Sequence, residues 1–172
     1  MTDERLGAYG LALPQLVGAR PWMQPQPAGT PTLSMRVEVG ATTDGPSRYD
    51  AESADLGLLG GGRLRFRHGS LEAHYVLPSV PPDADLLHPY LAPAAALVWR
   101  WGGHEALHAG AFAGRAGAVL LLGAKAAGKS TTLAWLADAG VPVLSDDLAV
   151  IDGAEVLAGP RSIDLRPEST QP

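Results

Sequence analysis

A glycine-rich stretch that ends in lysine and serine, residues 123–130, carries the clearest chemical signal in this chain of 172 residues. It fits the pattern G-x-x-x-x-G-K-[ST], in which the backbone N–H groups of a tight loop converge on phosphate oxygens. In that pattern Lys129 reaches the β- and γ-phosphates, and the hydroxyl of Ser130 ligates Mg²⁺. The sequence therefore predicts a nucleotide-binding loop, whose residues are Gly123, Ala124, Lys125, Ala126, Ala127, Gly128, Lys129, Ser130 and Thr131.

Two consecutive aspartates, Asp146 and Asp147, follow a short apolar segment 17 residues after Lys129. A strand that ends in an acid beside a nucleotide loop can hold Mg²⁺ directly or through water. Because adjacent residues of a strand point to opposite faces, one aspartate can face the metal while the other faces an incoming nucleophile. The alternative is that the pair merely begins the turn before the apolar residues 148–151.

The segments around the loop must position these groups. Residues 118–122 are a continuous apolar run, which predicts a strand buried on both faces that leads into the loop. Residues 131–139 predict a helix that Gly140 ends, and the positive end of its dipole would face the phosphates. Residues 141–144 predict a second strand that ends at the aspartates. Further along, Asp152 and Gly153 predict a tight hairpin turn.

The stretch from about residue 107 to residue 151 resembles the catalytic domain of HPr kinase/phosphorylase and its relatives. These relatives include kinases that phosphorylate a serine on ribosomally made peptide precursors, such as lasso-peptide tail kinases. Three elements carry the resemblance: His108 after Leu107, the loop at 123–131, and the acids that follow Leu144 and Ser145. The chain departs from HPr kinase proper at Ala109, Ala126 and Thr131, where that enzyme has a glycine, a loop glycine and a glutamate. These departures favour a divergent relative over a bacterial sugar-regulation kinase.

The resemblance implies a role for each matched residue. Asp146 is implied as the catalytic base that takes a serine proton, with Lys129 as the catalytic cation. Asp147 and Ser130 are implied as metal ligands, and His108 as an electrostatic helper beside the transferred phosphate. A packed or solvent-exposed histidine is the alternative for His108. The implied cofactors are ATP and Mg²⁺; no residue is assigned to the adenine, so GTP stays open.

We expect three regions along the chain. Residues 1–30 contain several prolines and predict a loose N-terminal arm or an edge segment. Residues 31–104 predict a small β-rich lobe with one helix begun near Pro93, and alternating strands at 33–39, 63–67 and 71–77 arranged as a meander. Residues 105–172 predict an α/β P-loop kinase core of the HPr kinase type. The C-terminal part of the family pattern is missing after residue 172, so we expect weak transfer by this chain alone, or a completing partner chain or homo-oligomer.

Arginines at alternate positions, Arg63, Arg65 and Arg67, form a one-sided basic stripe on one of these expected strands. Such a stripe can contact an acidic peptide or a phosphate. An ordinary solvated face is the alternative.

The composition excludes several classes of protein. The net charge of −5 gives the chain no bulk electrostatic reason to bind nucleic acid. The absence of cysteine excludes a disulfide framework, a zinc thiolate site and a cysteine nucleophile. No apolar run approaches the ~18 residues of a membrane span, and the polar N-terminus argues against a signal peptide. The prediction is a soluble cytoplasmic protein with no membrane partner.

The sequence thus predicts an ATP-dependent serine kinase that acts on a protein or peptide. The alternative of a different class is a nucleotide-binding regulatory or accessory protein without transferase activity. The acidic pair argues against that alternative, because nucleotide binding alone needs no second acid. A third interpretation, ATP hydrolysis that drives a conformational change, has no visible water-positioning glutamine to support it.

Overall fold

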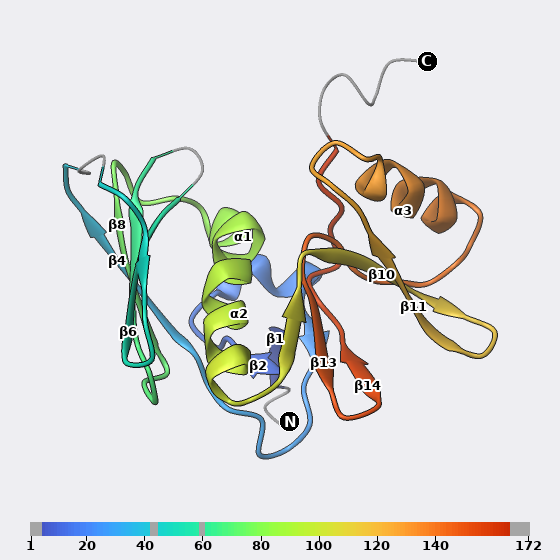
Figure 1. Cartoon of the computed structure of the whole chain (residues 1–172), viewed down its shortest axis with the longest axis horizontal. Coiled ribbons are helices and arrows are strands. Elements are labelled where there is room, and N and C mark those ends of the chain that lie inside the picture. The colour runs from blue at the N-terminus through green and yellow to red at the C-terminus, as the bar shows by residue number, and fades with distance from the viewer. Residues whose placement is uncertain (1–4, 42–44, 59–60, 166–172) are drawn as a thin grey trace.

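The computed structural model describes residues 5–41, 45–58 and 61–165. These residues form a mixed α/β structure that consists mostly of strands in several sheets, with few helices. Figure 1 shows the largest sheet on one side and the sheet that carries the glycine-rich loop on the other, with helix α2 and the N-terminal segment between them. The expected α/β class is confirmed at this level.

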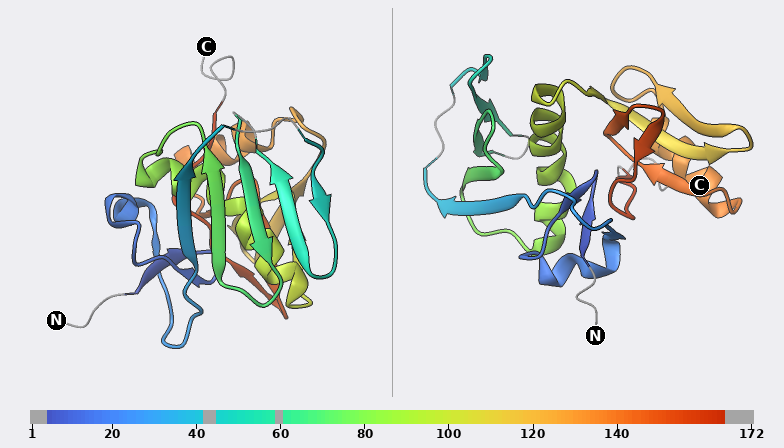
Figure 2. Two further views of the ribbon diagram at one scale, coloured as in Figure 1. Left: turned by 90° about the vertical axis from the view of Figure 1, so that its left-hand side faces the viewer. Right: turned by 90° about the horizontal axis from the view of Figure 1, so that it is seen from below.

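The largest sheet has five strands in the order β4-β8-β7-β6-β5. The strands are β4 (Ser34–Val39), β5 (Arg48–Tyr49), β6 (Ser53–Gly57), β7 (Arg63–Arg67) and β8 (Glu72–Leu77). All three strands expected in this region are present, and β7 turns antiparallel into β8 as expected. The meander differs from the expectation because the chain crosses from β4 to the opposite edge and returns through β5, β6 and β7. As a result β4 lies parallel to β8, as the left view of Figure 2 shows.

One face of this sheet is covered by a helical segment. The segment comprises α1 (Asp83–Asp85), η2 (Leu86–Tyr90) and α2 (Leu91–Trp101). The expected helix is α2, which starts two residues before Pro93, where a proline is tolerated in the first turn. Buried apolar side chains of α2 pack in one core with those that alternate along β7, and these are Leu91, Ala94, Ala95, Leu64 and Phe66.

Residues 5–25 form regular structure, where the sequence predicted a loose arm or an edge segment. They contain β1 (Leu6–Ala8), β2 (Leu11–Ala12), the 3₁₀ helix η1 (Val17–Trp22) and β3 (Gln24–Pro25), and the three strands form a small sheet. The physical reason is that apolar side chains between the prolines are buried in the main core, namely Tyr9, Leu11, Leu13, Leu16 and Met23. This core takes residues from all three expected regions, whose boundaries stay predictions.

The glycine-rich loop lies on a separate three-stranded sheet with the order β11-β10-β12. Its strands are β10 (Ala109–Gly114), β11 (Gly117–Leu122) and β12 (Val143–Ser145), and helix α3 (Lys129–Asp138) follows the loop. The expected helix and second strand are therefore present. Gly110 allows α3 to pack closely, because a Cβ at this position would lie 2.5 Å from the side chain of Leu133.

Strand β11 is not buried on both faces, which corrects the sequence-based expectation. Among the described strands it pairs only with β10, and α3 packs over β10 and β12 instead. Val119 and Leu122 are consequently exposed by 41% and 67%. A continuous apolar run identified the strand, but it did not reveal that the strand lies at an edge.

A third sheet contains β9 (Glu105–Leu107), β13 (Ala149–Asp152) and β14 (Glu155–Leu157). It contacts both helix α2, through its strand β9, and strand β10 of the loop-bearing sheet, through its strand β13. The expected tight turn is confirmed, because Asp152 pairs with Glu155 and Gly153 has a left-handed φ of 58°. None of the described helices is long and apolar enough to cross a membrane.

Candidate functional site

The loop between β11 and α3 has a backbone that suits anion binding. Gly128, with a φ of 84°, directly precedes the first helical residue, Lys129. Glycine adopts this left-handed conformation without steric cost, and it turns the chain sharply into the helix. The first N–H groups of a helix have no partner inside it and form a natural site for phosphate. Loop residues 123–127 are exposed to solvent, so this end of α3 is accessible.

Ala126 occupies a second left-handed position in the loop, with a φ of 67°. An alanine side chain costs about 1–2 kcal/mol in this conformation because its Cβ approaches the following carbonyl. This is the position at which the resembled family has a glycine. The backbone therefore keeps a conformation that glycine favours, although the residue is different.

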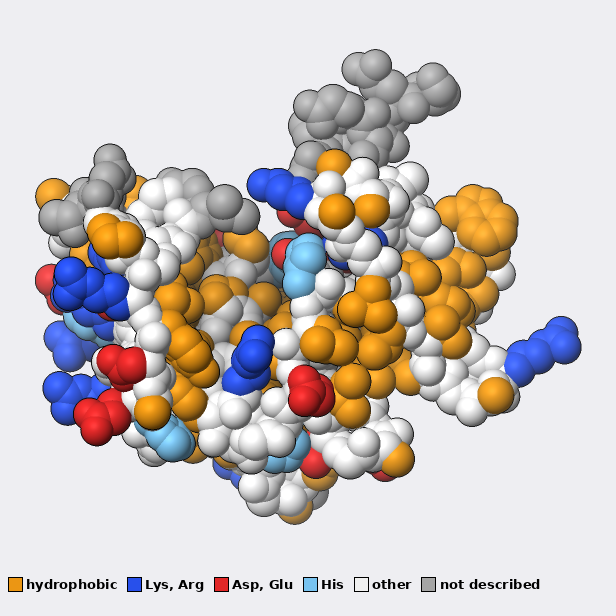
Figure 3. Space-filling model, in the orientation of Figure 1, with side chains coloured by type: hydrophobic (Ala, Val, Ile, Leu, Met, Phe, Trp, Pro, Cys, Tyr) orange, Lys and Arg blue, Asp and Glu red, His pale blue; other side chains and the backbone are white. Residues whose placement is uncertain are grey.

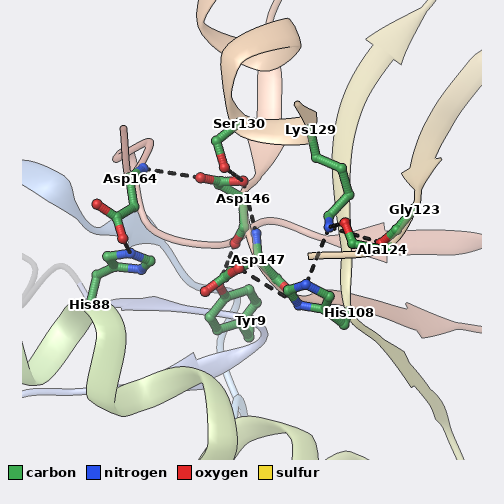
Figure 4. A network of polar contacts seen from close by, with 10 residues as sticks. All are labelled: Tyr9, His88, His108, Gly123, Ala124, Lys129, Ser130, Asp146, Asp147 and Asp164. Atoms are coloured by element: carbon green, nitrogen blue, oxygen red, sulfur yellow. Dashed lines mark hydrogen bonds and ion pairs between the residues drawn. The ribbon is translucent and has the colours of Figure 1, made fainter. Parts of the chain in front are cut away.

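The ammonium group of Lys129 folds back over the loop. Its Nζ donates hydrogen bonds to the carbonyl oxygens of Gly123 at 3.0 Å and Ala124 at 3.3 Å. It also lies 3.2 Å from Nε2 of His108 (Figure 4). Of the two lysines, Lys129 thus points across the loop, whereas Lys125 is exposed on it.

His108 lies between β9 and β10 and connects Lys129 to the acidic pair. A lysine ammonium can only donate, so Nε2 of His108 is the acceptor of this contact. Nδ1 is 3.0 Å from the carbonyl oxygen of Asp147 and donates to it. The structure thus brings together His108, Lys129 and Asp147, three residues that the sequence placed in one site.

Asp146 is the buried member of the acidic pair, with 3% of its surface exposed. Its Oδ1 accepts hydrogen bonds from the hydroxyl of Ser130 at 3.1 Å and from the N–H of Asp147 at 3.0 Å. Its Oδ2 accepts from the N–H of Asp164 at 3.0 Å. These three donors hold the carboxylate in one orientation beside the first turn of α3 (Figure 4).

Asp147 differs from Asp146 in both backbone and exposure. Its φ of 71° is left-handed, which is uncommon for a residue other than glycine and often marks a functional site. Its side chain is 44% exposed, and its Oδ1 lies 3.6 Å from Nδ1 of His108. The turn therefore directs the two neighbouring carboxylates into different surroundings. The resemblance implied Ser130 and Asp147 as metal ligands, whereas in the structure the hydroxyl of Ser130 donates a hydrogen bond to Asp146.

The side chain of Tyr9 contacts this turn, and no motif pointed to it because Tyr9 lies within the proline-rich segment. Its hydroxyl donates to the carbonyl oxygen of Asp146 at 3.3 Å. The side chain is fully buried. Burial raises the pKa of Tyr9 above its ordinary value, and the charges of Asp147 and Asp146 add to this effect, so the phenol stays a neutral donor.

Asp164 and His88 extend the network and were also missed. The N–H of Asp164 binds Asp146, and the carboxylate of Asp164 lies 3.9 Å from Nε2 of His88. Both residues come from segments outside the recognised motifs, namely the chain after β14 and the helical segment before α2. A motif search along the sequence therefore has no means of finding them.

The donor set of the site fits Mg²⁺. Among the described residues no group of three or more His, Asp or Glu side chains could hold a metal ion by the protein alone. Mg²⁺ does not need such a group, because it is commonly bound by one or two protein oxygens together with substrate phosphates and water. The hydroxyl oxygen of Ser130 and a carboxylate oxygen of Asp146 lie 3.1 Å apart at the N-terminal end of α3.

Comparisons of the chain with protein-family models, curated proteins and solved structures found no match.

Proposed function

We propose that this chain is a Mg-ATP-dependent kinase that transfers the γ-phosphate to a serine hydroxyl of a protein or peptide. The observation that carries this proposal is the hydrogen bond between Ser130 Oγ and Asp146 Oδ1. It joins the hydroxyl of the glycine-rich loop to a carboxylate at the end of a strand. In P-loop nucleotide-binding proteins these are the two groups that hold Mg²⁺ beside the phosphates.

The loop and Lys129 supply phosphate binding in this proposal. Loop N–H groups and the positive end of the α3 dipole attract the triphosphate. Lys129 already lies over the loop carbonyls of Gly123 and Ala124, so rotation of its flexible stem exchanges these acceptors for phosphate oxygens. His108 keeps the ammonium group on this side of the loop.

Ser130 and Asp146 would hold Mg²⁺. The ion, when bound, neutralises negative charge on the β- and γ-phosphates. Asp146 suits this position because three donors fix its orientation and burial keeps it from reaching a bulky substrate. The resemblance implied Asp147 for this role, and the contact geometry favours Asp146 instead.

Asp147 is then the better candidate for the catalytic base. A base must come within hydrogen-bond reach of the substrate hydroxyl, and Asp147 is the exposed acid of the pair. In the reaction, the serine proton passes to the carboxylate of Asp147 while the serine oxygen forms a bond to the γ-phosphorus. The bond from that phosphorus to the bridging oxygen breaks, and ADP leaves with the electron pair. His108, which binds the Asp147 carbonyl, acts as a positioning residue for both Asp147 and Lys129.

Phosphorylation of a peptide library tests the activity. The full chain is incubated with Mg-ATP and short peptides that each contain one serine, and phosphoserine and ADP are measured by mass spectrometry. A matched library with alanine in place of serine is the control. We expect phosphoserine only in the serine library, and Lys129→Ala should abolish it. ATP binding without phosphoserine would contradict the kinase proposal and favour an accessory nucleotide-binding protein.

A further inference from the structure

The outer face of the five-stranded sheet, on the side away from α2, carries a row of charged residues that crosses every strand. Residues directly opposite each other on neighbouring strands share a face of the sheet. In strand order the row is Arg36, His74, Arg65, Asp55 and Arg48. Figure 3 shows basic side chains, with acidic ones among them, on this side of the molecule.

A shallow hollow of about 600 Å³ lies over this row. Four arginines line it, namely Arg36, Arg48, Arg65 and Arg67. Three acids, Asp50, Asp55 and Glu72, line it as well. The hollow therefore has one more arginine than it has carboxylates, whereas the chain as a whole has a net charge of −5. Local fields of this kind select charged partners and raise their rate of association.

Not all basic residues of this face are available to a partner. Arg63 is buried, where it binds Asp55 and the carbonyl oxygens of Gly45 and Pro46, so it has a structural role. Arg65 forms an ion pair with the same Asp55, whose Oδ2 lies 3.6 Å from Nε of Arg65.

Nε2 of His74, which also belongs to the row, is 3.0 Å from a carboxylate oxygen of Glu38. By contrast, the described part of the chain provides no ion pair for Arg36, Arg48 or Arg67.

We propose that this face docks an acidic, extended segment of a polypeptide, whose carboxylates meet Arg36, Arg48 and Arg67. The planar guanidinium group matches a carboxylate with two parallel hydrogen bonds. Neighbouring strands lie about 4.8 Å apart, so Arg36 and Arg48, four strand spacings apart, are separated by about 19 Å across the sheet. An extended peptide of about six residues covers that distance.

The acids within the hollow favour a polypeptide over a nucleic acid. Asp50, Asp55 and Glu72 lie among the arginines. A nucleic acid carries a phosphate at every step, so some of its charges would meet these acids. A peptide can place neutral side chains there and carboxylates only opposite the arginines.

A titration with a defined acidic peptide tests the proposal without ATP. The probe is a fluorescently labelled ten-residue peptide of alternating glutamate and serine, and its anisotropy is followed as the full chain is added at low salt. The same peptide with glutamine in place of glutamate is the matched probe. We expect binding of the glutamate peptide and none of the glutamine peptide.

Variants locate the binding on the sheet. Arg36→Gln, Arg48→Gln and Arg67→Gln should each weaken binding by about twofold to fivefold, as expected for an exposed ion pair. The triple variant should lose about eightfold or more in affinity, because the free-energy contributions of separate sites add. Arg115→Gln, in the turn between β10 and β11, removes the same charge elsewhere and should bind like the wild type. If a glutamine variant fails to fold by circular dichroism, the lysine variant at that position should show a smaller loss.

Three results would overturn the proposal: equal affinity for both peptides, an equal loss in Arg115→Gln, or tighter binding of a ten-residue single-stranded oligonucleotide. Lys129→Ala should bind the peptide normally. The failure of peptide docking and the failure of the kinase proposal are therefore separate results.

Discussion

The hydroxyl of Ser130 donates a hydrogen bond of 3.1 Å to Oδ1 of Asp146, and this bond links the first turn of α3 to the end of β12. One of its members is almost fully buried, so the bond contributes to folding as well as to the proposed metal site. Substitutions that remove this contact should therefore change both the stability of the fold and nucleotide binding.

Removal of the Ser130 hydroxyl should destabilise the protein. Ser130→Ala leaves the buried carboxylate of Asp146 with one donor fewer, which costs about 1–3 kcal/mol. Ser130→Thr keeps the hydroxyl and should lose less than half of that. Urea denaturation of both variants measures the difference. Equal loss in the two variants would show that the hydrogen bond is not the cause.

The two lysines of the loop should differ strongly in their effect on ATP binding. Lys129→Ala removes the cation that lies over the loop and should weaken Mg-ATP binding by about tenfold to 100-fold, as for a hydrogen bond to a charged group. Lys125→Ala removes an equal charge from an exposed position and should change affinity by about fivefold or less. Calorimetric titration compares them, and similar losses would mean that only overall charge matters.

Replacement by glycine should destabilise the protein less at Ala126 than at Ala127. Ala126→Gly relieves a left-handed alanine, which offsets the entropic cost of glycine of about 0.5–1 kcal/mol. Ala127→Gly has only the entropic cost and should lower the melting temperature. Thermal unfolding of both variants tests this, and the reverse order would remove the argument that the loop keeps the backbone of a glycine position.

Two buried tyrosines should make the fold sensitive to alkali. Burial raises the pKa of both Tyr9 and Tyr75 above the ordinary value of 10.0, which their hydroxyls keep in the unfolded chain. Above about pH 10 the unfolded state therefore loses protons that the native state retains, and stability falls by up to about 1.4 kcal/mol per pH unit for each tyrosine. Below pH 10 neither group contributes a pH dependence.

Denaturation in urea at several alkaline pH values measures this slope. Tyr75→Phe and Tyr9→Phe should each remove the contribution of one tyrosine to this alkaline fall in stability. Both variants should also lose some stability at neutral pH, because the Tyr75 hydroxyl donates to the carbonyl oxygen of Tyr90 and the Tyr9 hydroxyl to that of Asp146. Tyr49→Phe, at an exposed position, is the control. An unchanged alkaline slope in the two buried variants would contradict this account.

Much of the local structure could be predicted because it depends on neighbours in sequence. The alternation of β7, the glycine that begins α3 and the turn at Gly153 are local signals of this kind. The exposure of β11 could not be predicted, because an apolar run does not reveal which strands pair with it.

For the candidate site, too, several of the residues could be predicted from the sequence but some of the contacts between them could not. The motifs identified the loop and both aspartates, but the order of residues could not show which carboxylate Ser130 contacts. The left-handed backbone of Asp147 decides this, and it depends on the turn after β12. Tyr9 reaches Asp146 from 137 residues away, which no local pattern can indicate.

The Mg²⁺ dependence of ATP affinity in Asp146→Asn and Asp147→Asn tests the central claim most directly. Affinity is measured with and without Mg²⁺ within each variant, so that a general change in the loop cancels. We predict that Mg²⁺ raises the ATP affinity of the wild type and of Asp147→Asn by factors that agree within a few fold. This is expected if Asp147 acts only when the serine proton leaves. Asp146→Asn should lose most of that gain. Loss of the gain in Asp147→Asn with its retention in Asp146→Asn would reverse the assigned roles, and a wild-type chain that binds no ATP would contradict the account as a whole.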